Sequence, residues 1–282
     1  MNFSNSTTEK TERLKNQKSL TFQWETIDWK QVEYDVNRLQ TRIAKATAKG
    51  DNNKAKRLQY LLTHSFSAKA YAIRKVTTNK GKNSSGVDKK LWSTSASKMK
   101  DVLSLTDKNY RAKPLKRVYI KKKGKNKKRP LGIPTMYDRA MQTLYALALE
   151  PIAETKGDTI SFRFRRGRSA KDDCEQIFCV LARKCSPTWI LEGDIKGCFD
   201  NINHKWLQDN IPMDKRIMKQ FLKSGFIYEG KLFPTETGSP QGGAISSIYA
   251  NMTLDGLEKV IQDKYHRNSK GKIENHYRQK LK

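Results

Sequence analysis

Two short segments carry residue types that phosphoryl-transfer chemistry uses. Asp194 lies near the end of residues 189–195, which predict a buried strand with one carboxylate at its end. Residues 237–243, Thr-Gly-Ser-Pro-Gln-Gly-Gly, predict a tight turn before a helix, where glycines let backbone N–H groups approach an anion. Mg2+ prefers carboxylate oxygens, with water and phosphate oxygens completing its coordination. The two segments therefore predict half of a metal-dependent phosphoryl-transfer site, in which Asp194 is a ligand and the carbonyl of Ile195 adds an oxygen.

Each of these features also has an ordinary structural interpretation. A carboxylate after a strand is often a turn or helix-capping residue. Phe199, five residues after Asp194, would be a core side chain if taken alone. If Asp194 holds the metal of a bound nucleotide, the Phe199 ring would instead press on the sugar and exclude a 2′-hydroxyl. Asp200 precedes a helix predicted from Asn203, which favours a capping or local hydrogen-bonding role over metal binding.

The composition indicates a polyanionic partner. The 282 residues include 57 Lys and Arg against 28 Asp and Glu, a formal net charge of +29, which favours binding to nucleic acid. No apolar run approaches the roughly 18–20 residues of a membrane-spanning helix, and the polar N-terminus lacks the apolar core of a secretory signal. The four cysteines form no CxxC pair, so reduced thiols are expected. We therefore expect no membrane partner and a location in the bacterial cytoplasm or in an organelle.

Two basic segments predict contacts with phosphate groups. Residues 108–129 hold twelve basic residues and no acidic one, and they read as two strands joined by a charged tip. A solvated face or a localisation patch is the alternative, but a tip this charged would repel itself without a polyanion. Residues 162–170 interleave two phenylalanines with Arg163, Arg165, Arg166 and Arg168. That combination suits phosphates and stacked bases, although a basic loop anchored by its two aromatic rings fits equally well.

The remaining pattern is mostly helical. Residues 1–19 are weakly patterned and predict a flexible tail, and two antiparallel helices follow as core-packing elements. We also predict a polar loop over 77–88, a buried helix over 138–150 that ends at Pro151, and further helices over 172–185, 203–210 and about 240–265. The apolar stripes of the first two helices comprise Trp29, Val32, Val36, Leu39, Ile43 and Ala46, then Leu58, Leu61, Leu62 and Phe66.

Three ordered motifs resemble the reverse transcriptases encoded by group II introns. They are Arg129-Pro130-Leu131-Gly132-Ile133-Pro134-Thr135 with Asp138-Arg139 and Gln142, then Gly193-Asp194-Ile195 with Cys198-Phe199-Asp200, then Gly238-Ser239-Pro240-Gln241-Gly242-Gly243 with Asn251. The helical start, from Trp29 through Arg74-Lys75-Val76-Thr77 and Gly86-Val87-Asp88, is similar to the N-terminal extension of that family. The resemblance covers roughly residues 24–265, and the ordered set is far more specific than any single motif.

The resemblance implies an α+β right-hand polymerase with an N-terminal helical extension over 20–80, fingers over 81–185 and a partial palm over 186–282. It implies that Asp194 and the Ile195 carbonyl bind catalytic Mg2+, two ions in the complete site, and that Phe199 is the ribose gate. Its substrates would be dNTPs, an RNA template with a DNA primer, and the group II intron RNA, which such proteins help to splice. It assigns the incoming nucleotide to Lys122 or Lys123 with Arg129 and to Gln241, and nucleic acid to Arg74, Lys75, Lys80, Lys82 and the four arginines of 162–170.

The chain also departs from the family pattern. The Tyr-Ala-Asp-Asp motif that supplies the other metal-binding aspartates is absent, as are the thumb, maturase and endonuclease regions, and Arg163 and Arg166 stand where the family commonly has Gly and Pro. One carboxylate cannot hold two Mg2+ ions against their hydration. We therefore expect this chain to polymerise DNA only with a second polypeptide that carries the missing aspartates. The alternative is a non-enzymatic maturase-type module that binds intron RNA. A plain nucleic-acid-binding protein would explain the charge but not the ordered motifs.

Overall fold

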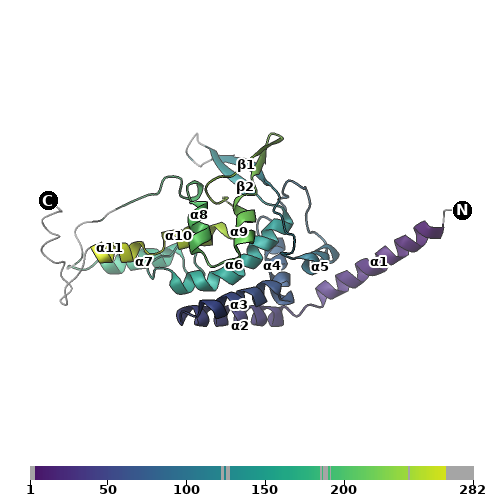
Figure 1. Ribbon diagram of the computed structural model, residues 1–282, viewed down its shortest axis with the longest axis horizontal. Coiled ribbons are helices and arrows are strands. Elements are labelled where there is room, and N and C mark those ends of the chain that lie inside the picture. Colours follow the sequence, from purple (N-terminus) through teal and green to yellow (C-terminus); the bar gives the residue numbers. More distant parts are fainter. Residues whose placement is uncertain are drawn as a thin grey trace.

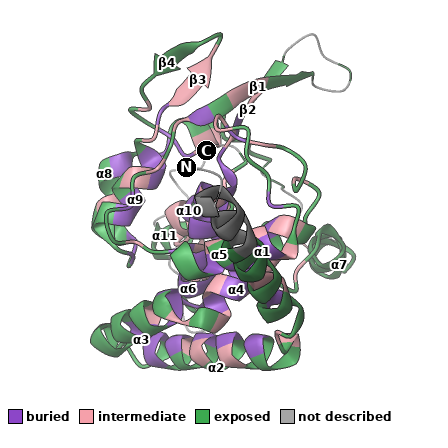
Figure 2. Ribbon diagram, turned by 90° about the vertical axis from the view of Figure 1, so that its right-hand side faces the viewer, coloured by how far each residue is buried: buried purple, intermediate pink, exposed green. Residues whose placement is uncertain are grey.

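The fold is built around one long buried helix. The computed structural model describes residues 4–121, 124, 128–184, 186, 190, 192–240 and 242–264, which form a mostly helical α/β fold with one small sheet. Helix α6 (Met136–Lys156) lies at the centre, with α2 (Trp29–Ala48), α3 (Asn52–His64) and α4 (Phe66–Thr78) packed against it. The sheet lies on the opposite side of α6 from α2 and α3 (Figures 1 and 2).

Polar residues begin most of the helices. In each case the side chain accepts a hydrogen bond from a backbone N–H of the first turn, which would otherwise lack a partner. These N-caps are Asp28, Asp51, Ser65, Thr94, Thr135, Ser169, Asn203 and Asp214. The other helices are α1 (Ser4–Glu25), α5 (Ser95–Ser104), α7 (Ala170–Leu181), the 3-10 turn η1 (Cys198–Asp200), α8 (His204–Asn210), α9 (Lys215–Leu222), α10 (Ser246–Leu254) and α11 (Leu257–Lys264).

The sheet joins the basic hairpin to a later pair of strands. Its order is β2 (Lys128–Ile133), β1 (Leu115–Lys121), β3 (Phe226–Tyr228) and β4 (Lys231–Phe233). Strands β1 and β2 pair antiparallel, which confirms the predicted hairpin. Strand β3 lies parallel to β1, with Leu115 opposite Phe226, so the sheet is mixed. The long helical connection between β2 and β3 permits this parallel pairing, which a tight turn could not make.

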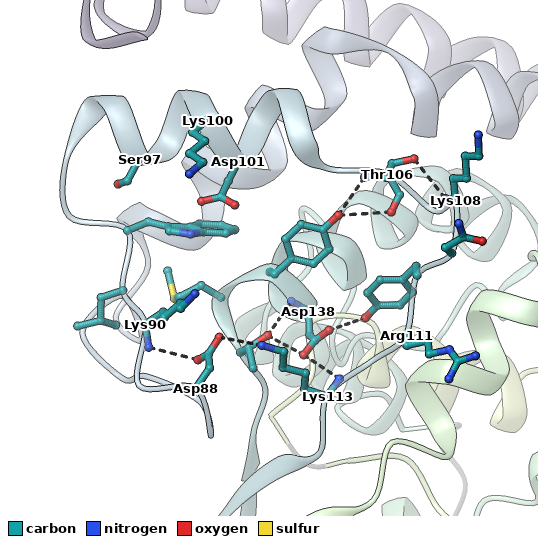
Figure 3. Close-up of a pocket in the computed structure, with 17 residues that line it drawn as sticks. Asp88, Lys90, Ser97, Lys100, Asp101, Thr106, Lys108, Arg111, Lys113 and Asp138 are labelled. Carbon is teal, nitrogen blue, oxygen red and sulfur yellow. Dashed lines mark hydrogen bonds and ion pairs between the residues drawn. The ribbon is translucent and has the colours of Figure 1, made fainter. Parts of the chain in front are cut away.

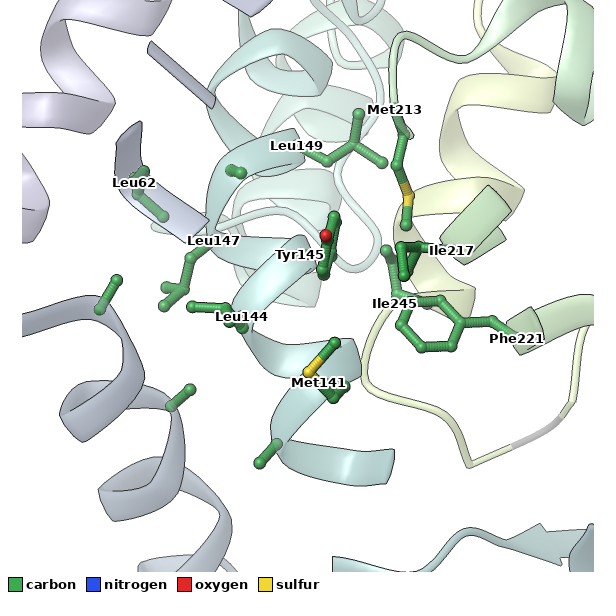
Figure 4. Close-up of a cluster of buried hydrophobic side chains, with 14 of the residues drawn as sticks. Leu62, Met141, Leu144, Tyr145, Leu147, Leu149, Met213, Ile217, Phe221 and Ile245 are labelled. Carbon is green, nitrogen blue, oxygen red and sulfur yellow. The ribbon is translucent and has the colours of Figure 1, made fainter. Parts of the chain in front are cut away.

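The core continues from the N-terminal helices across α6 to the C-terminal half. Figure 4 shows α6 side chains between Leu62 of α3 on one side and Ile217 and Phe221 of α9 on the other. Leu144 and Leu149 of α6 are buried, as predicted for this helix. A helix that is apolar on most sides must be covered on most sides. Helix α6 therefore fixes the N-terminal helices relative to the segments that carry the glycine-rich turn.

Helix α6 does not end at Pro151, contrary to the sequence prediction. It continues to Lys156 with Pro151 inside it. Proline cannot donate to the carbonyl four residues earlier, which is that of Leu147. The side chain of Gln40 on α2 donates to that carbonyl instead, with an Nε2–O distance of 2.8 Å. A hydrogen bond from a distant helix thus replaces the one that proline removes.

The N-terminal segment is helical over most of its length. Residues 4–25 form helix α1, which packs against α5 and extends away from the body (Figure 1), and the predicted flexibility of 1–19 stays a prediction. Apolar patterning is weak because only the last turns of α1 reach the core, through Leu20 and Trp24. In the next helices the Ser65 cap starts a new helix at Phe66. Leu61 and Phe66 are consequently exposed rather than part of the predicted stripe.

Two C-terminal elements are corrected. Among the described residues of 189–195, none lies in a strand, and Ile190 and Ile195 are exposed. A strand requires a neighbour for its backbone groups, and the described sheet provides none there. The long helix predicted over 240–265 divides into α10 and α11 at Gly256, whose φ is +96°. The N–H of Gly256 donates to both carboxylate oxygens of Asp158, at 3.0 and 3.1 Å, which holds the break.

Candidate nucleotide-binding site

The glycine-rich turn closes onto the segment that follows Asp194. The N–H of Gly238 donates to the carbonyl of Ile202 (2.8 Å), and the N–H of Ser239 donates to the carbonyl of Phe199 (2.7 Å). Gly238 has a φ of +83°, and a Cβ atom there would lie 2.7 Å from the carbonyl oxygens of Phe199 and Asp200. Only glycine permits this conformation and this approach together. Two motifs that are 38 residues apart, from Asp200 to Gly238, thus form one structural unit.

The other end of the turn contacts the basic hairpin and α6. A Cβ atom on Gly242 would lie 2.9 Å from the Leu131 side chain and 3.1 Å from the carbonyl oxygen of Gly132. The Gln142 side chain accepts from the N–H of Ala244 at 3.1 Å. All three motifs of the sequence therefore meet around this one turn. Sequence order alone could not establish that meeting.

A pocket of about 230 Å3 opens where the turn faces the sheet. Phe199, Asp200 and Ser239 line one side, and Arg117 of β1 lines the other. The Arg117 guanidinium lies 3.8 Å from the centre of the Phe226 ring. Within the described part of the chain, Arg117 Nε and the hydroxyl of the buried Ser239 have no hydrogen-bond partner. Both atoms are buried and both residues line the pocket, which suits an anionic or polar ligand.

Sequence reasoning did not find Arg117 or Ser239 as site residues. Arg117 was recognised only as part of a strand, and Ser239 only as part of the glycine-rich turn. The signal that could have found Arg117 is a cation inside a strand that precedes a charged tip. Its place at the pocket, however, depends on the pairing of β1 with β3, which lies more than 100 residues further along the chain.

Phe199 lines the pocket, and its role as a gate stays a prediction. Its side chain is half-buried, lines the pocket and packs edge to face on the exposed ring of Phe164, with the ring centroids 6.1 Å apart. The core interpretation also holds in part, because one side of the ring contacts the buried cluster. A ring fixed on one side and open on the other can limit the shape of a bound ligand.

The metal-binding prediction has no complete ligand set among the described residues. Asp194 is exposed and does not line the pocket, and Ile195 beside it is also exposed. The described residues contain no group of three or more His, Cys, Asp or Glu side chains that could hold a metal. A single exposed carboxylate does not fit a two-Mg2+ centre, so no catalytic step through metal follows from this geometry.

The predicted phosphate-binding residues of the hairpin are only partly described. Arg129 lies on β2 with an exposed side chain. Lys122 and Lys123 lie outside the described residues, as does Gln241 of the glycine-rich turn.

The predicted nucleic-acid contacts divide into exposed and internal residues. Arg165 is a correction: it is buried, and its guanidinium pairs with Glu154 at 3.0 Å. Arg168 donates to the carbonyl of Ser161 at 2.9 Å, and Arg74 pairs with Glu33 at 3.0 Å. Part of each guanidinium therefore binds the protein itself. The remaining predicted contacts have exposed side chains: Lys75, Lys80, Lys82, Arg163 and Arg166.

The buried carboxylate of the first motif, Asp138, is a structural residue. Asp138 is buried and accepts from the hydroxyls of Thr135 (2.6 Å) and Tyr110 (2.7 Å). Burial raises the pKa of the Asp138 carboxyl, and those two hydrogen bonds offset part of the rise. Its neighbour Arg139 donates to the carbonyl of Gly81 (2.9 Å) and also to that of Ser84. These contacts tie the predicted polar loop to the start of α6.

Comparison with known families agrees with this arrangement. Residues 24–105 match the N-terminal domain of reverse transcriptase, and residues 120–277 match the reverse transcriptase (RNA-dependent DNA polymerase) family. The chain is 36% identical over 220 residues to the group II intron-encoded protein LtrA of Lactococcus lactis subsp. cremoris, covering 74% of this chain. It belongs to the group II intron-encoded reverse transcriptases.

Other relatives of this reverse transcriptase family member come from bacterial and intron contexts. It is 30% identical over 244 residues to the protein YkfC of Escherichia coli K12, and 34% identical over 170 residues to an uncharacterized 91 kDa protein in the cob intron of Schizosaccharomyces pombe. These matches cover 82% and 58% of this chain. The match spans 36% of the length of LtrA and 63% of that of YkfC. No helix among the described residues is long and apolar enough to cross a membrane.

Proposed function

We propose that this reverse transcriptase chain supplies the nucleotide- and template-binding part of an RNA-directed DNA polymerase. The observation that carries the proposal is the pocket in which Phe199, Ser239 and Arg117 meet around the glycine-rich turn. A half-buried ring, a buried hydroxyl without a partner among the described residues and a guanidinium in the pocket wall suit the sugar and phosphates of a dNTP. Family membership supports the same reading.

The other roles follow the motif positions. Arg129, with Lys122 or Lys123, would neutralise the triphosphate, and Gln241 would lie beside the nucleotide. Asp194 and the Ile195 carbonyl would serve as Mg2+ ligands only in a site that further aspartates, supplied by a second polypeptide, complete. In this assignment residues 81–185 are the fingers, residues 186–282 are part of the palm, and residues 20–80 extend them toward RNA.

Nucleotide binding can be tested without polymerisation. We expect the chain to bind a dNTP in the presence of Mg2+, and Arg117→Ala to weaken that binding by about tenfold, the typical cost of a charge-assisted contact. Lys116→Ala is the matched control: it removes the same charge from the next residue of β1, whose side chain points to the opposite face. Equal losses in the two variants would contradict the assignment of the pocket.

Polymerase activity is expected only when more carboxylates are supplied. Residues 1–282 alone should give no template-dependent product in a primer-extension assay with Mg2+. Addition of a chain carrying the other palm aspartates should restore product, and Asp194→Ala should abolish it again. Product from residues 1–282 alone that Asp194→Ala removes would refute the proposed dependence.

A maturase-type function is a second candidate, supported by the exposed basic residues of the N-terminal half. Lys75, Lys80 and Lys82 are exposed close to α4 and its following loop. Under this alternative the chain binds its intron RNA far more tightly than random RNA and promotes splicing, and Asp194→Ala leaves both unchanged. Loss of splicing activity in Asp194→Ala, with RNA binding intact, would count against a non-enzymatic role.

A further inference from the structure

A second and larger cavity lies away from the glycine-rich turn. It has a volume of about 720 Å3 and lies between α5, the segment over 105–113 and the start of α6 (Figure 3). That volume is within the range of about 300–1,000 Å3 that is usual for small-ligand sites. None of the residues assigned above to the dNTP pocket lines it.

Basic side chains outnumber acidic ones around this cavity. Each of the three carboxylates that line it has partners: Asp138 accepts hydrogen bonds from two hydroxyls, Asp88 pairs with Lys113 at 3.8 Å, and Asp101 lies near Lys100 and Lys90. Figure 3 shows Lys100 and Asp101 extending from α5 over the cavity, with Asp88, Lys113 and Asp138 on the opposite wall. The five basic residues are Lys90, Lys100, Lys108, Arg111 and Lys113.

Aromatic rings form part of the wall between these charges. Trp92, Tyr110 and Tyr137 line the cavity. The Tyr137 hydroxyl accepts from the N–H of Thr106 at 3.1 Å and donates to the carbonyl of Ser104 at 3.0 Å. The Tyr110 hydroxyl is held by Asp138. Both tyrosine rings are therefore fixed before any ligand arrives, so a stacked base would cost little ordering of the protein.

The loop that follows α4 places the basic residues Lys80 and Lys82 next to the cavity wall. Arg139 holds the carbonyls of Gly81 and Ser84, so the loop carrying Lys80 and Lys82 is fixed beside the start of α6. A Cβ atom on Gly86 would lie 2.6 Å from the Cα of Thr135, which lines the cavity, and the loop therefore packs directly on this wall. A backbone of several phosphates could follow these lysines, whereas a free nucleotide would reach few of them.

We propose that this cavity binds one unpaired nucleotide of a structured RNA, with the base against the aromatic wall and the flanking phosphates on Lys90, Lys100 and the loop lysines. The proposal rests on the proposed function only in taking RNA as the partner. A paired base cannot enter because it is stacked inside a helix, so the site reads an unpaired, extruded base. Recognition is of a nucleotide unit, which both RNA and a free nucleoside monophosphate contain.

The test compares two hairpin RNAs that differ by a single bulged 5-iodouridine. We expect the chain of 282 residues to bind the bulged RNA about tenfold more tightly than the paired one, the scale of one base–aromatic stack. Lys100→Ala should remove most of that preference. Lys98→Ala is the matched control, since it removes the same charge from α5 but its ammonium faces Trp24, 5.7 Å from the ring centre. The Lys98→Ala variant should weaken binding to both RNAs equally.

Photocrosslinking gives a readout that does not depend on variants. Irradiation of the bulged complex should join the 5-iodouridine to a peptide that contains Trp92, Tyr110 or Tyr137. Equal affinity for the two RNAs, or a crosslink only elsewhere, would overturn the nucleotide site while leaving RNA binding intact. Effective competition by uridine 5′-monophosphate at the RNA concentration would overturn the choice of RNA. Failure to bind either RNA would overturn the proposed function as well.

Discussion

Replacing Gly238 by alanine should separate the two motifs that form the nucleotide pocket. Alanine at a φ of +83° costs about 1–2 kcal/mol, because the left-handed conformation brings Cβ close to a carbonyl oxygen. The added Cβ would also lie 2.7 Å from the carbonyl oxygens of Phe199 and Asp200, and both are backbone atoms that cannot rotate away. Forcing that space open costs about 1–3 kcal/mol more. We expect Gly238→Ala to lower the free energy of unfolding by about 2–5 kcal/mol in total.

Gly230→Ala is the matched control for this prediction. Gly230 has a φ of +77° in the turn between β3 and β4, and a Cβ atom there would meet nothing within 4 Å. Its substitution should therefore cost only the conformational part, about 1–2 kcal/mol. Urea unfolding at 25 °C measures both variants, and the m-value shows whether the unfolding reaction has changed.

The same pair of variants should differ in ligand binding. Gly238→Ala moves Ser239 relative to Phe199, so dNTP affinity should fall, whereas Gly230→Ala should keep the affinity of the original chain. If both variants lose the same stability and keep the same dNTP affinity, the close contact at Gly238 does not shape the pocket, and the reasoning is refuted.

Three further predictions address the elements around the site. In a double-mutant cycle, Gln40→Ala should lower the free energy of unfolding by about 1–3 kcal/mol, and by less when Pro151→Ala restores the missing helix N–H. Equal losses in both backgrounds would contradict the replacement hydrogen bond. Arg165→Ala should destabilise the fold by about 2 kcal/mol or more without a specific loss of RNA affinity, whereas Arg166→Ala should weaken RNA binding without changing the midpoint of thermal unfolding. Burial raises the pKa of Asp138 in the folded protein, so the stability that this carboxyl contributes is fully present below the ordinary carboxyl pKa of about 3.9 and is lost as pH rises through the raised pKa. Asp138→Asn should therefore flatten the dependence of the unfolding free energy on pH between about pH 4 and pH 7. An unchanged slope would contradict the burial argument.

Local sequence patterns predicted the elements whose signals are short-range. The β1–β2 hairpin follows from two strand-like segments around a charged tip, and it forms as predicted. Helix α2 follows from its apolar spacing, and Val36 and Ile43 are buried accordingly. These signals involve residues within a few positions of one another, so the surrounding chain changes them little.

The predictions that were wrong depended on partners far away in the chain. Pro151 is a helix terminator by local rules, but Gln40 provides the hydrogen bond that lets α6 continue. The pattern of residues 162–170 does not distinguish its four arginines, and it is the ion pair with Glu154 and hydrogen bonds to backbone carbonyls that make Arg165 internal. The predicted strand over 189–195 needed a neighbouring strand that the described sheet does not contain.

The sequence by itself determined the family, the strong positive charge and the three motifs, because residue types and their order are enough to establish them. Only the tertiary structure decided that these motifs meet at one turn, that Arg117 and Ser239 share a pocket, and which arginines remain available to RNA. The physical reason is that a site is made by contacts between distant segments. Those contacts depend on how α6 and the sheet bury their apolar surfaces, which no local pattern contains.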